Sequence, residues 1–302
     1  MILIRTAVLS SLLTVACGAN NSLPDVDGGV NPSGCTPLSV SQQIDVPYVV
    51  RGNAASDSMT RLDVFPPPSD AICGRPIVVW VHGGGWSVGD KSNQMTDKLP
   101  FFHGLGAVVV SINYRLTTEG GTVQHPDHVE DVATAIAWVR KHAVELGGAS
   151  NRLAVLGHSA GAHLVALVGT NKRFLAKQGL SAADVACIGS YDSEYTVSSI
   201  VAREPSYKAV FTSDPIAWED ASPSAHVSTG LPPFQLACRG TMGRTAQCEE
   251  FAGSIRRVGS QAETIDASSL AHEEVNSEIG KVSDGIMTPR IREFLSRCFQ
   301  VQ

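Results

Sequence analysis

Short apolar runs recur along this chain and alternate with stretches in which apolar residues follow a helical spacing. Residues 77–81 are all apolar, as expected of a strand that is buried on both faces. The pattern predicts strands at residues 61–66, 77–81, 106–115, 153–156, 184–189, 232–238 and 262–267. It predicts helices at residues 129–146, 247–258 and 288–295. Strands that alternate with helices predict an α/β fold with a mostly parallel central sheet.

A serine flanked by glycines stands directly after the predicted strand at residues 153–156. The run Gly-His-Ser-Ala-Gly at residues 157–161 is followed by the small and apolar residues 162–169. A G-x-S-x-G sequence between a strand and a helix is typical of a nucleophile elbow. The glycines permit a sharp turn, so we expect the hydroxyl of Ser159 at the C-terminal edge of the sheet.

A second glycine motif follows the predicted strand at residues 77–81. Residues 82–86 read His-Gly-Gly-Gly-Trp. Consecutive glycines let backbone N–H groups converge on one point, where a tetrahedral oxyanion could be stabilised. We expect the amides of Gly84, Gly85 and Ala160 to be the donors of this oxyanion hole. A merely flexible turn is the alternative.

The composition fits one large α/β domain after removal of an N-terminal leader. The chain has 302 residues, of which 43% are hydrophobic and 17% charged, with a net charge of −6. A length of this order suits one large α/β domain, predicted at residues 35–302. Lys and Arg are scattered rather than gathered into a basic stripe, so no nucleic-acid partner is expected.

The N-terminus carries an export signal. Residues 1–16 combine a positive charge with a short apolar stretch, as in a secretory signal peptide. Residues 13–17 resemble the lipobox of bacterial lipoproteins, with Cys17 as the lipidated residue and Thr14 where leucine is usual. We therefore expect a membrane contact only through this lipid anchor. Cleavage of an ordinary signal peptide near Ala16 or Ala19, giving a periplasmic or secreted protein, is the alternative.

Residues 17–34 are rich in Asn, Ser, Pro, Asp and Gly, which predicts a flexible linker.

Besides Cys17 the chain has an even number of cysteines, which is typical of disulfides in an exported protein. They are Cys35, Cys73, Cys187, Cys238, Cys248 and Cys298. Cys238 and Cys248 are close enough in sequence to close a small loop. The other pairings stay open, and buried free thiols are the alternative. No spacing of Cys or His indicates a metal site.

These motifs occur together with further short sequences. Asn-Tyr-Arg-Leu stands at residues 113–116, His-Pro at 125–126 and an aspartate at Asp131. In combination they resemble the carboxylesterases related to bifunctional feruloyl esterase and kynurenine formamidase, from about Leu62 to Leu295. The resemblance implies an α/β-hydrolase fold, a Ser-His-Asp triad that acts on esters or small amides, and no cofactor.

The histidine of such a triad follows the last strand, because this fold orders the residues as Ser, acid and His. Of the nine histidines, His272 is the one that follows the predicted strand at residues 262–267. We expect it to take the proton of Ser159 and to return it to the leaving group.

The acid is less clear from the sequence. In the family an Asp follows the penultimate strand, but Gly243 stands at that place. The preceding predicted strand, residues 184–189, is followed by Asp192 at the same edge of the sheet. Asp192 is therefore the predicted acid, or else it caps its loop. The other candidates are Asp214, Asp220 and Glu249.

Residues 191–225 have no clear sheet pattern, and by the resemblance they are expected to form a small cap over the site. Their aromatic residues either line an acyl or aryl pocket or simply pack; they are Tyr195, Tyr207, Phe211 and Trp218. The leading hypothesis is a serine carboxylesterase acting on a small-molecule or polysaccharide-linked ester. An amidase, formamidase or peptidase on the same triad is one alternative. An inactive hydrolase-fold binding protein on the cell surface is another.

Overall fold

The computed structural model describes residues 40–68 and 74–300. The predicted signal peptide, the linker and three cysteines (Cys17, Cys35 and Cys73) lie outside these ranges. In the described part of the chain, no helix is both long and apolar enough to cross a membrane.

Within the described residues, eight strands form one sheet in the order β1-β2-β4-β3-β5-β6-β7-β8. Strand β2 runs antiparallel to both its neighbours, and the strands from β4 to β8 are parallel. Their bounds are β1 (Gln43–Pro47), β2 (Arg61–Phe65), β3 (Arg75–Val81), β4 (Val108–Ile112), β5 (Gly148–His158), β6 (Cys187–Tyr191), β7 (Phe234–Cys238) and β8 (Ala262–Asp266). The predicted α/β-hydrolase fold is confirmed.

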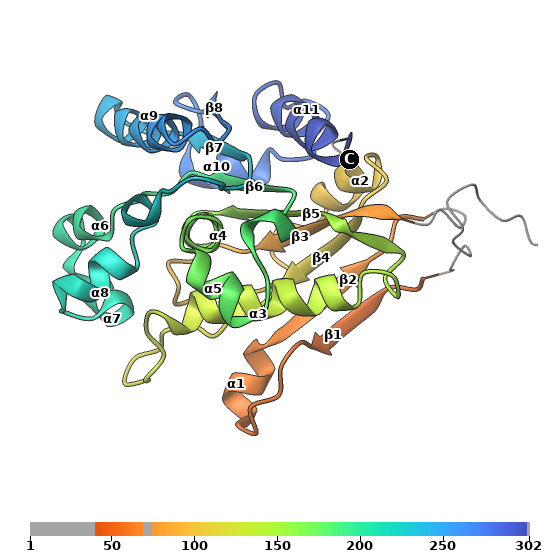
Figure 1. Cartoon of the computed structure of the whole chain (residues 1–302), viewed down its shortest axis with the longest axis horizontal. Coiled ribbons are helices and arrows are strands. Elements are labelled where there is room, and N and C mark those ends of the chain that lie inside the picture. Colours follow the sequence, from red (N-terminus) through yellow and green to blue (C-terminus); the bar gives the residue numbers. More distant parts are fainter. Residues whose placement is uncertain (1–39, 69–73, 301–302) are drawn as a thin grey trace, which may run out of the picture. The chain divides into compact units, whose positions relative to one another are not determined.

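Helices cover both faces of this sheet (Figure 1). Because side chains alternate along a strand, Ile77, Val79 and Val81 of β3 enter one core, while Val78 and Trp80 enter the other. The first core is closed by α3 (Asp127–Lys141), α4 (Ala160–Thr170), α5 (Lys172–Lys177) and α9 (Met242–Arg257). The second is closed by α2 (Lys98–His103), α10 (His272–Ser277) and α11 (Met287–Gln300). A short helix, α1 (Ala54–Met59), connects β1 and β2.

The segment between β6 and β7 forms the predicted insertion. It contains α6 (Val197–Arg203), η2 (Pro205–Tyr207), α7 (Lys208–Phe211), α8 (Pro215–Asp220) and η3 (Pro223–His226). Figure 1 shows α6, α7 and α8 grouped beside one end of the sheet. The ring of Phe211 packs edge-on against Trp86 of the second glycine motif, with centroids 4.9 Å apart. The insertion therefore lies against the predicted oxyanion loop.

Most predicted boundaries shift in the structure; the helix predicted at residues 129–146, for example, spans Asp127–Lys141, and the strand predicted at residues 153–156 spans Gly148–His158. The strand predicted at residues 184–189 begins only at Cys187, because Asp184 ends the short helix η1 (Ala182–Asp184). The Asp184 carboxylate accepts the backbone N–H of Ser181, which fixes that turn. Helix α9 begins at Met242, five residues before the predicted start at residue 247.

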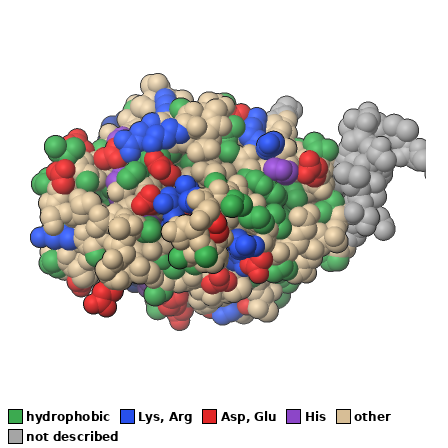
Figure 2. Space-filling model, turned by 90° about the horizontal axis from the view of Figure 1, so that it is seen from below, with side chains coloured by type: hydrophobic (Ala, Val, Ile, Leu, Met, Phe, Trp, Pro, Cys, Tyr) green, Lys and Arg blue, Asp and Glu red, His purple; other side chains and the backbone are tan. Residues whose placement is uncertain are grey.

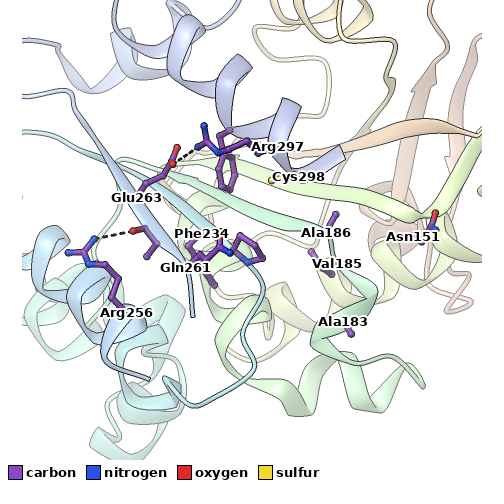
Figure 3. A pocket seen from close by; sticks show the side chains of 13 residues that line it. Asn151, Ala183, Val185, Ala186, Phe234, Arg256, Gln261, Glu263, Arg297 and Cys298 are labelled. Atoms are coloured by element: carbon purple, nitrogen blue, oxygen red, sulfur yellow. Dashed lines mark hydrogen bonds and ion pairs between the residues drawn. The ribbon is translucent and has the colours of Figure 1, made fainter. Parts of the chain in front are cut away.

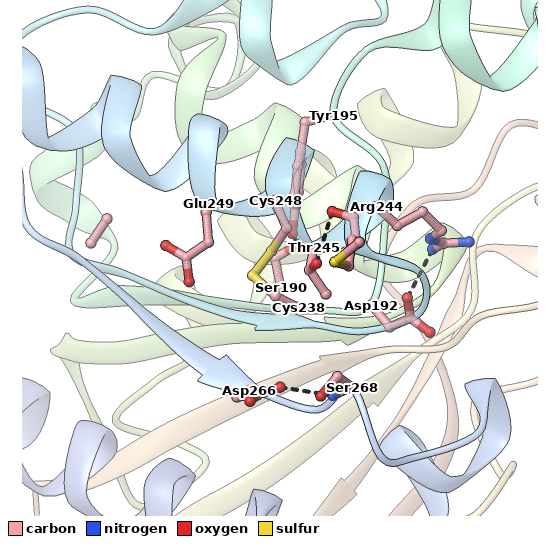
Figure 4. The surroundings of a disulfide bond; sticks show 12 residues. Ser190, Asp192, Tyr195, Cys238, Arg244, Thr245, Cys248, Glu249, Asp266 and Ser268 are labelled. Atoms are coloured by element: carbon pink, nitrogen blue, oxygen red, sulfur yellow. Dashed lines mark hydrogen bonds and ion pairs between the residues drawn. A yellow bond between two sulfur atoms is a disulfide. The ribbon is translucent and has the colours of Figure 1, made fainter.

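Two disulfide bonds join described residues. Cys238 at the end of β7 pairs with Cys248 on α9, with Cα atoms 5.6 Å apart (Figure 4). Cys187 at the start of β6 pairs with Cys298 and ties α11 to the sheet. On the face shown in Figure 2, acidic and basic side chains are intermixed rather than separated into patches of one sign.

Candidate active site

Ser159 occupies the tight turn between β5 and α4. Its backbone has a φ of 55° and a ψ of −120°, which is strained for any residue other than glycine. The turn depends on Gly161, because a Cβ at that position would come within 2.2 Å of the Val81 carbonyl oxygen. The strand–turn–helix therefore places the Ser159 hydroxyl at the C-terminal edge of the sheet, as predicted.

The structure brings Ser159, His272 and Asp192 together. His272 is the first residue of α10, and its Nε2 lies 2.9 Å from Ser159 Oγ. Its Nδ1 lies 2.5 Å from Oδ2 of Asp192, which directly follows β6. In this arrangement Nδ1–H donates to the carboxylate, and Nε2 is free to accept the serine proton. The side chain of Asp192 is only 1% exposed, whereas that of His272 is 38% exposed and open to a substrate.

Two arginines also hold the Asp192 carboxylate. Arg239 donates to Oδ2 through Nε, and Arg244 donates to Oδ1 through Nη2 at 2.8 Å. Burial alone would raise the pKa of Asp192, but the hydrogen bonds from His272 and Arg239 and the nearby positive charges outweigh it and lower this pKa. Asp192 is therefore ionised at neutral pH.

The other carboxylates considered from the sequence lie elsewhere. Asp214 accepts the N–H of Ile216 and caps α8. Asp220 pairs with Arg173 and His125, and Glu249 lies on α9 beside Arg256 at 3.7 Å. Of the four candidates, Asp192 is the one within hydrogen-bond distance of His272.

The His-Gly-Gly-Gly loop lies against the elbow. A Cβ at Gly83 would stand 3.0 Å from Ser159 Cβ, so the two turns touch. Gly84 and Gly85 have φ values of 111° and 57°, and the Gly84 carbonyl is held by the N–H of Val88 at 3.0 Å. Among the described residues, the amides of Gly84, Gly85 and Ala160 donate no hydrogen bond. These three N–H groups are therefore without an acceptor in the described structure, which the expected oxyanion hole requires.

His158 is a site residue that the sequence reasoning missed. Its Nε2–H donates to the backbone carbonyl of His272 at 2.9 Å, and the two rings lie 4.7 Å apart. Burial, and then repulsion from His272, lower the pKa of His158 to about 3, so its ring is neutral at pH 7. His158 is the residue between glycine and serine in the G-x-S-x-G motif. Its place directly before the nucleophile could have marked it as a site residue.

The sequence predicts no metal site. One group of side chains nevertheless lies close enough together to resemble a set of metal ligands. Within the described ranges, the ligand atoms of His158, Asp192 and His272 lie within 4.8 Å of one another. His272 bonds to Asp192 and Ser159, Asp192 also accepts from Arg239, and His158 Nε2–H donates to the backbone carbonyl of His272. The group is thus part of a hydrogen-bonded network.

A small cavity of about 290 Å³ opens over these residues. Its lining includes Ser159, His272 and Gly85 from the sheet side, and Tyr207 from the insertion. Tyr207 is the one predicted cap aromatic that lines it. The others pack: Tyr195 stacks on Phe251, Phe211 contacts Trp86, and Trp218 donates to the Thr212 carbonyl.

Charged residues on the other wall of the same cavity were also missed. Arg203, Arg239 and Arg244 line it together with Asp192 and Glu194. Arg239 and Arg244 flank Gly243, which stands where the resemblance leads us to expect the acid, and that departure from the expected pattern was the available signal.

A larger cavity, of about 530 Å³, lies at the N-terminal ends of β6, β7 and β8 (Figure 3). Arg297 pairs with Glu263 there, and Arg256 donates to the backbone of Ala262. Its lining includes no serine or histidine among the described residues, and its Cys298 is in a disulfide. This cavity therefore lacks the nucleophile and base that the smaller one has.

Comparison with known proteins places this site in context. The model of the BD-FAE family matches residues 62–246. Esterase LipQ of Mycobacterium tuberculosis is 29% identical over 236 residues, which are 72% of this chain and 54% of the relative. Esterase LipC of the same organism is 30% identical over 216 residues, which are 67% of this chain and 53% of the relative. The chain spans about half the length of these curated relatives.

Solved structures share the fold. Thermogutta terrifontis esterase 2, phosphoramylated by tabun, superposes with a TM-score of 0.68 at 23% identity, covering 86% of this chain and 97% of the other. A truncated carbohydrate esterase from gut microbiota gives a TM-score of 0.70 at 16% identity, covering 87% of this chain and 97% of the other. At these identities the likeness shows a common fold.

Proposed function

The chain belongs to the BD-FAE family, and from this membership and the geometry of the site we propose that it is a serine hydrolase that cleaves carboxylic esters. The observation that carries the proposal is the hydrogen-bonded line from Ser159 through His272 to the ionised Asp192. Such a line turns a weakly nucleophilic hydroxyl into a nucleophile. The names of the relatives, which are esterases, also support this reaction class.

In the proposed reaction, Ser159 Oγ attacks the ester carbonyl while His272 Nε2 takes its proton. Asp192 holds the Nδ1–H tautomer and stabilises the imidazolium that forms. The amides of Gly84, Gly85 and Ala160 stabilise the oxyanion. His272 then protonates the leaving alcohol, and water attacks the acyl-enzyme by the same steps in reverse.

The test is a burst of p-nitrophenol from p-nitrophenyl acetate, together with labelling by a fluorophosphonate probe. We expect Ser159→Ala to abolish both, with a fall in kcat of about 10⁶-fold. Esters with acyl chains of several lengths, and anilides matched to each, separate an esterase from an amidase. If the purified protein turns over no ester and the probe does not label Ser159, the proposal is wrong and a binding protein is the better description.

We also propose that the chain is exported and carries lipid on Cys17. The two disulfides between described residues support an oxidising compartment. The lipobox-like sequence before Cys17 supports the anchor. Metabolic labelling with an alkyne fatty acid is expected to mark the wild type and not Cys17→Ala. Equal labelling of both, or of neither, would reject the anchor.

A further inference from the structure

Three arginines converge on the cavity that contains Ser159. They come from different elements: Arg203 from α6, Arg239 from the turn after β7, and Arg244 from the first turn of α9. They face two carboxylates in the same lining, Asp192 and Glu194. With three positive and two negative groups, the lining has a net charge of +1 when His272 is neutral.

The two carboxylates do not use all the donors that the arginines offer. Arg244 contacts both carboxylates, Asp192 through Nη2 and Glu194 through Nη1 at 3.5 Å. Arg203 pairs with Glu194 and is 52% exposed. Arg239 bonds to Asp192 through Nε, and in the described part of the chain its two Nη groups donate no hydrogen bond. A guanidinium with two free Nη groups presents the edge that binds a carboxylate in bidentate geometry.

The arginine segment is also held in place before a substrate arrives. The disulfide between Cys238 and Cys248 closes a covalent loop that contains both Arg239 and Arg244 (Figure 4). The side chain of Arg239 is 18% exposed, so it reaches the cavity without being freely mobile in solvent. A preorganised cation loses little entropy on binding an anion, which favours recognition rather than mere solvation.

We propose, on the basis of the esterase function proposed above, that this site takes esters that carry a carboxylate close to the scissile bond, and that Arg239 binds this carboxylate. A neutral ester offers the free Nη groups of Arg239 no charged, bidentate acceptor. The cavity volume of about 290 Å³ is at the small end of ligand pockets, so the carboxylate and the ester lie within a few bonds of each other. Arg203 and Arg244 add to the positive potential at the cavity.

Arg239 also helps to hold Asp192, so its removal lowers the activity on every substrate. The test therefore measures a ratio of kcat/KM values between substrates of nearly the same shape. One pair, 4-acetoxybenzoate and 4-acetoxybenzamide, differs in charge on the alcohol side. The other pair, monoethyl succinate and ethyl levulinate, differs in charge on the acyl side.

We expect the wild type to prefer the anionic member of at least one pair, and Arg239→Gln to lose this preference by about 10- to 100-fold. Arg257→Gln is the matched control, because Arg257 lies on α9 but pairs with Glu250 outside the cavity. It is expected to keep the wild-type ratio. Equal losses on the anionic and the neutral member in Arg239→Gln would show that Arg239 only positions Asp192, and would overturn the inference.

A binding experiment separates this inference from the esterase proposal. Calorimetry with Ser159→Ala measures the binding of both members of both pairs without any turnover. Tighter binding of the anion in at least one pair, by about tenfold or more and lost in the Ser159→Ala, Arg239→Gln double variant, supports the inference even if the wild type hydrolyses none of the compounds. Equal affinities within both pairs would reject it even if the enzyme is an active esterase.

Discussion

The two halves of the candidate site are built in different ways. The nucleophile half, consisting of Ser159 and the loop at residues 82–86, is shaped by backbone: glycines allow close approach and positive φ. The acid half, consisting of Asp192 with Arg239 and Arg244, is held by charged side chains from three separate elements. Backbone geometry is sensitive to a single added methyl group, whereas an ion network is sensitive to the removal of one charge.

This difference explains why one half follows the pattern of the related esterases and the other does not. A turn made of glycines has few alternatives, because any Cβ meets backbone at under 3 Å at positions such as Gly84 and Gly161. A carboxylate needs only to reach Nδ1 of His272, and the ends of two neighbouring strands both offer that position. Arg239 and Arg244, which follow β7, then neutralise the carboxylate of Asp192 after β6.

Of the changes that test this comparison, the one with the largest expected effect is in the acid half. Asp192→Asn is expected to lower kcat by about 10⁴-fold, because the amide favours the wrong tautomer of His272. It also leaves Arg239 and Arg244 without their shared anion, so we expect a loss of about 3 kcal/mol in the free energy of unfolding. Steady-state kinetics and urea titration measure the two effects separately.

Glu249→Gln is the control for this change, since Glu249 lies on α9 and pairs only with Arg256 in the described residues. It is expected to leave kcat near that of the wild type. Near-normal activity of Asp192→Asn would mean that another group orients His272. Asp192 and its arginines would then not be the acid half of the site.

A smaller effect is expected from a methyl group in the nucleophile half. Gly84 has a φ of 111°, and a Cβ there would come within 2.0 Å of the Val88 carbonyl oxygen. Gly84→Ala therefore displaces the loop and with it one or more oxyanion donors, which is expected to cost about 10²- to 10³-fold in kcat. The measurement is kcat on p-nitrophenyl acetate, with labelling by a fluorophosphonate to count active sites.

Gly179→Ala is the matched control, because Gly179 also has a positive φ (73°) but nothing within 4 Å of an added Cβ. It is expected to cost about 1 kcal/mol of stability and no activity. If Gly84→Ala kept full activity, the oxyanion would have to be held by other donors.

The sequence predicts most of the fold, because long apolar runs such as residues 77–81 leave little choice of structure. It also predicts the positions of Ser159 and His272 through chain order, and that of Asp192 through the edge of the sheet. The arginine contacts could not be predicted. Arg239 and Arg244 lie 47 and 52 positions from Asp192 in sequence, and their meeting depends on the side-chain packing of separate elements.

The boundary errors have a similar origin. Strand β1 was not predicted, because its residues Gln43–Pro47 lie at the sheet edge and are mostly exposed, which removes the apolar signal. The short helices of the insertion are four to seven residues long and show no repeating face. His158 was missed because a histidine next to a nucleophile has no periodic signature of its own.

The smallest predicted effect is on the pH dependence of stability. The two halves of the site lose stability in different pH ranges as the pH falls. His158 in the nucleophile half has a folded-state pKa of about 3, below its ordinary value of 6.5. Below pH 6.5 the unfolded chain therefore binds a proton that the folded chain does not, and stability falls as the pH falls. Asp192 has a lowered pKa, so its contribution to stability is complete above its ordinary value of 3.8 and is lost only as the pH falls below it.

Between pH 7 and pH 5, His158 is expected to cost up to about 2 kcal/mol of the free energy of unfolding. Urea titrations at the two pH values are expected to give a smaller difference for His158→Gln than for the wild type. His142→Gln is the control, because His142 follows α3 away from the site and bonds to the Trp138 carbonyl. Asp192→Asn is expected to keep the wild-type difference in this range, since Asp192 is ionised in both states there. An unchanged difference in His158→Gln would mean that the buried ring of the nucleophile half takes up a proton without cost. The two halves would then differ in how they are built but not in how they respond to acid.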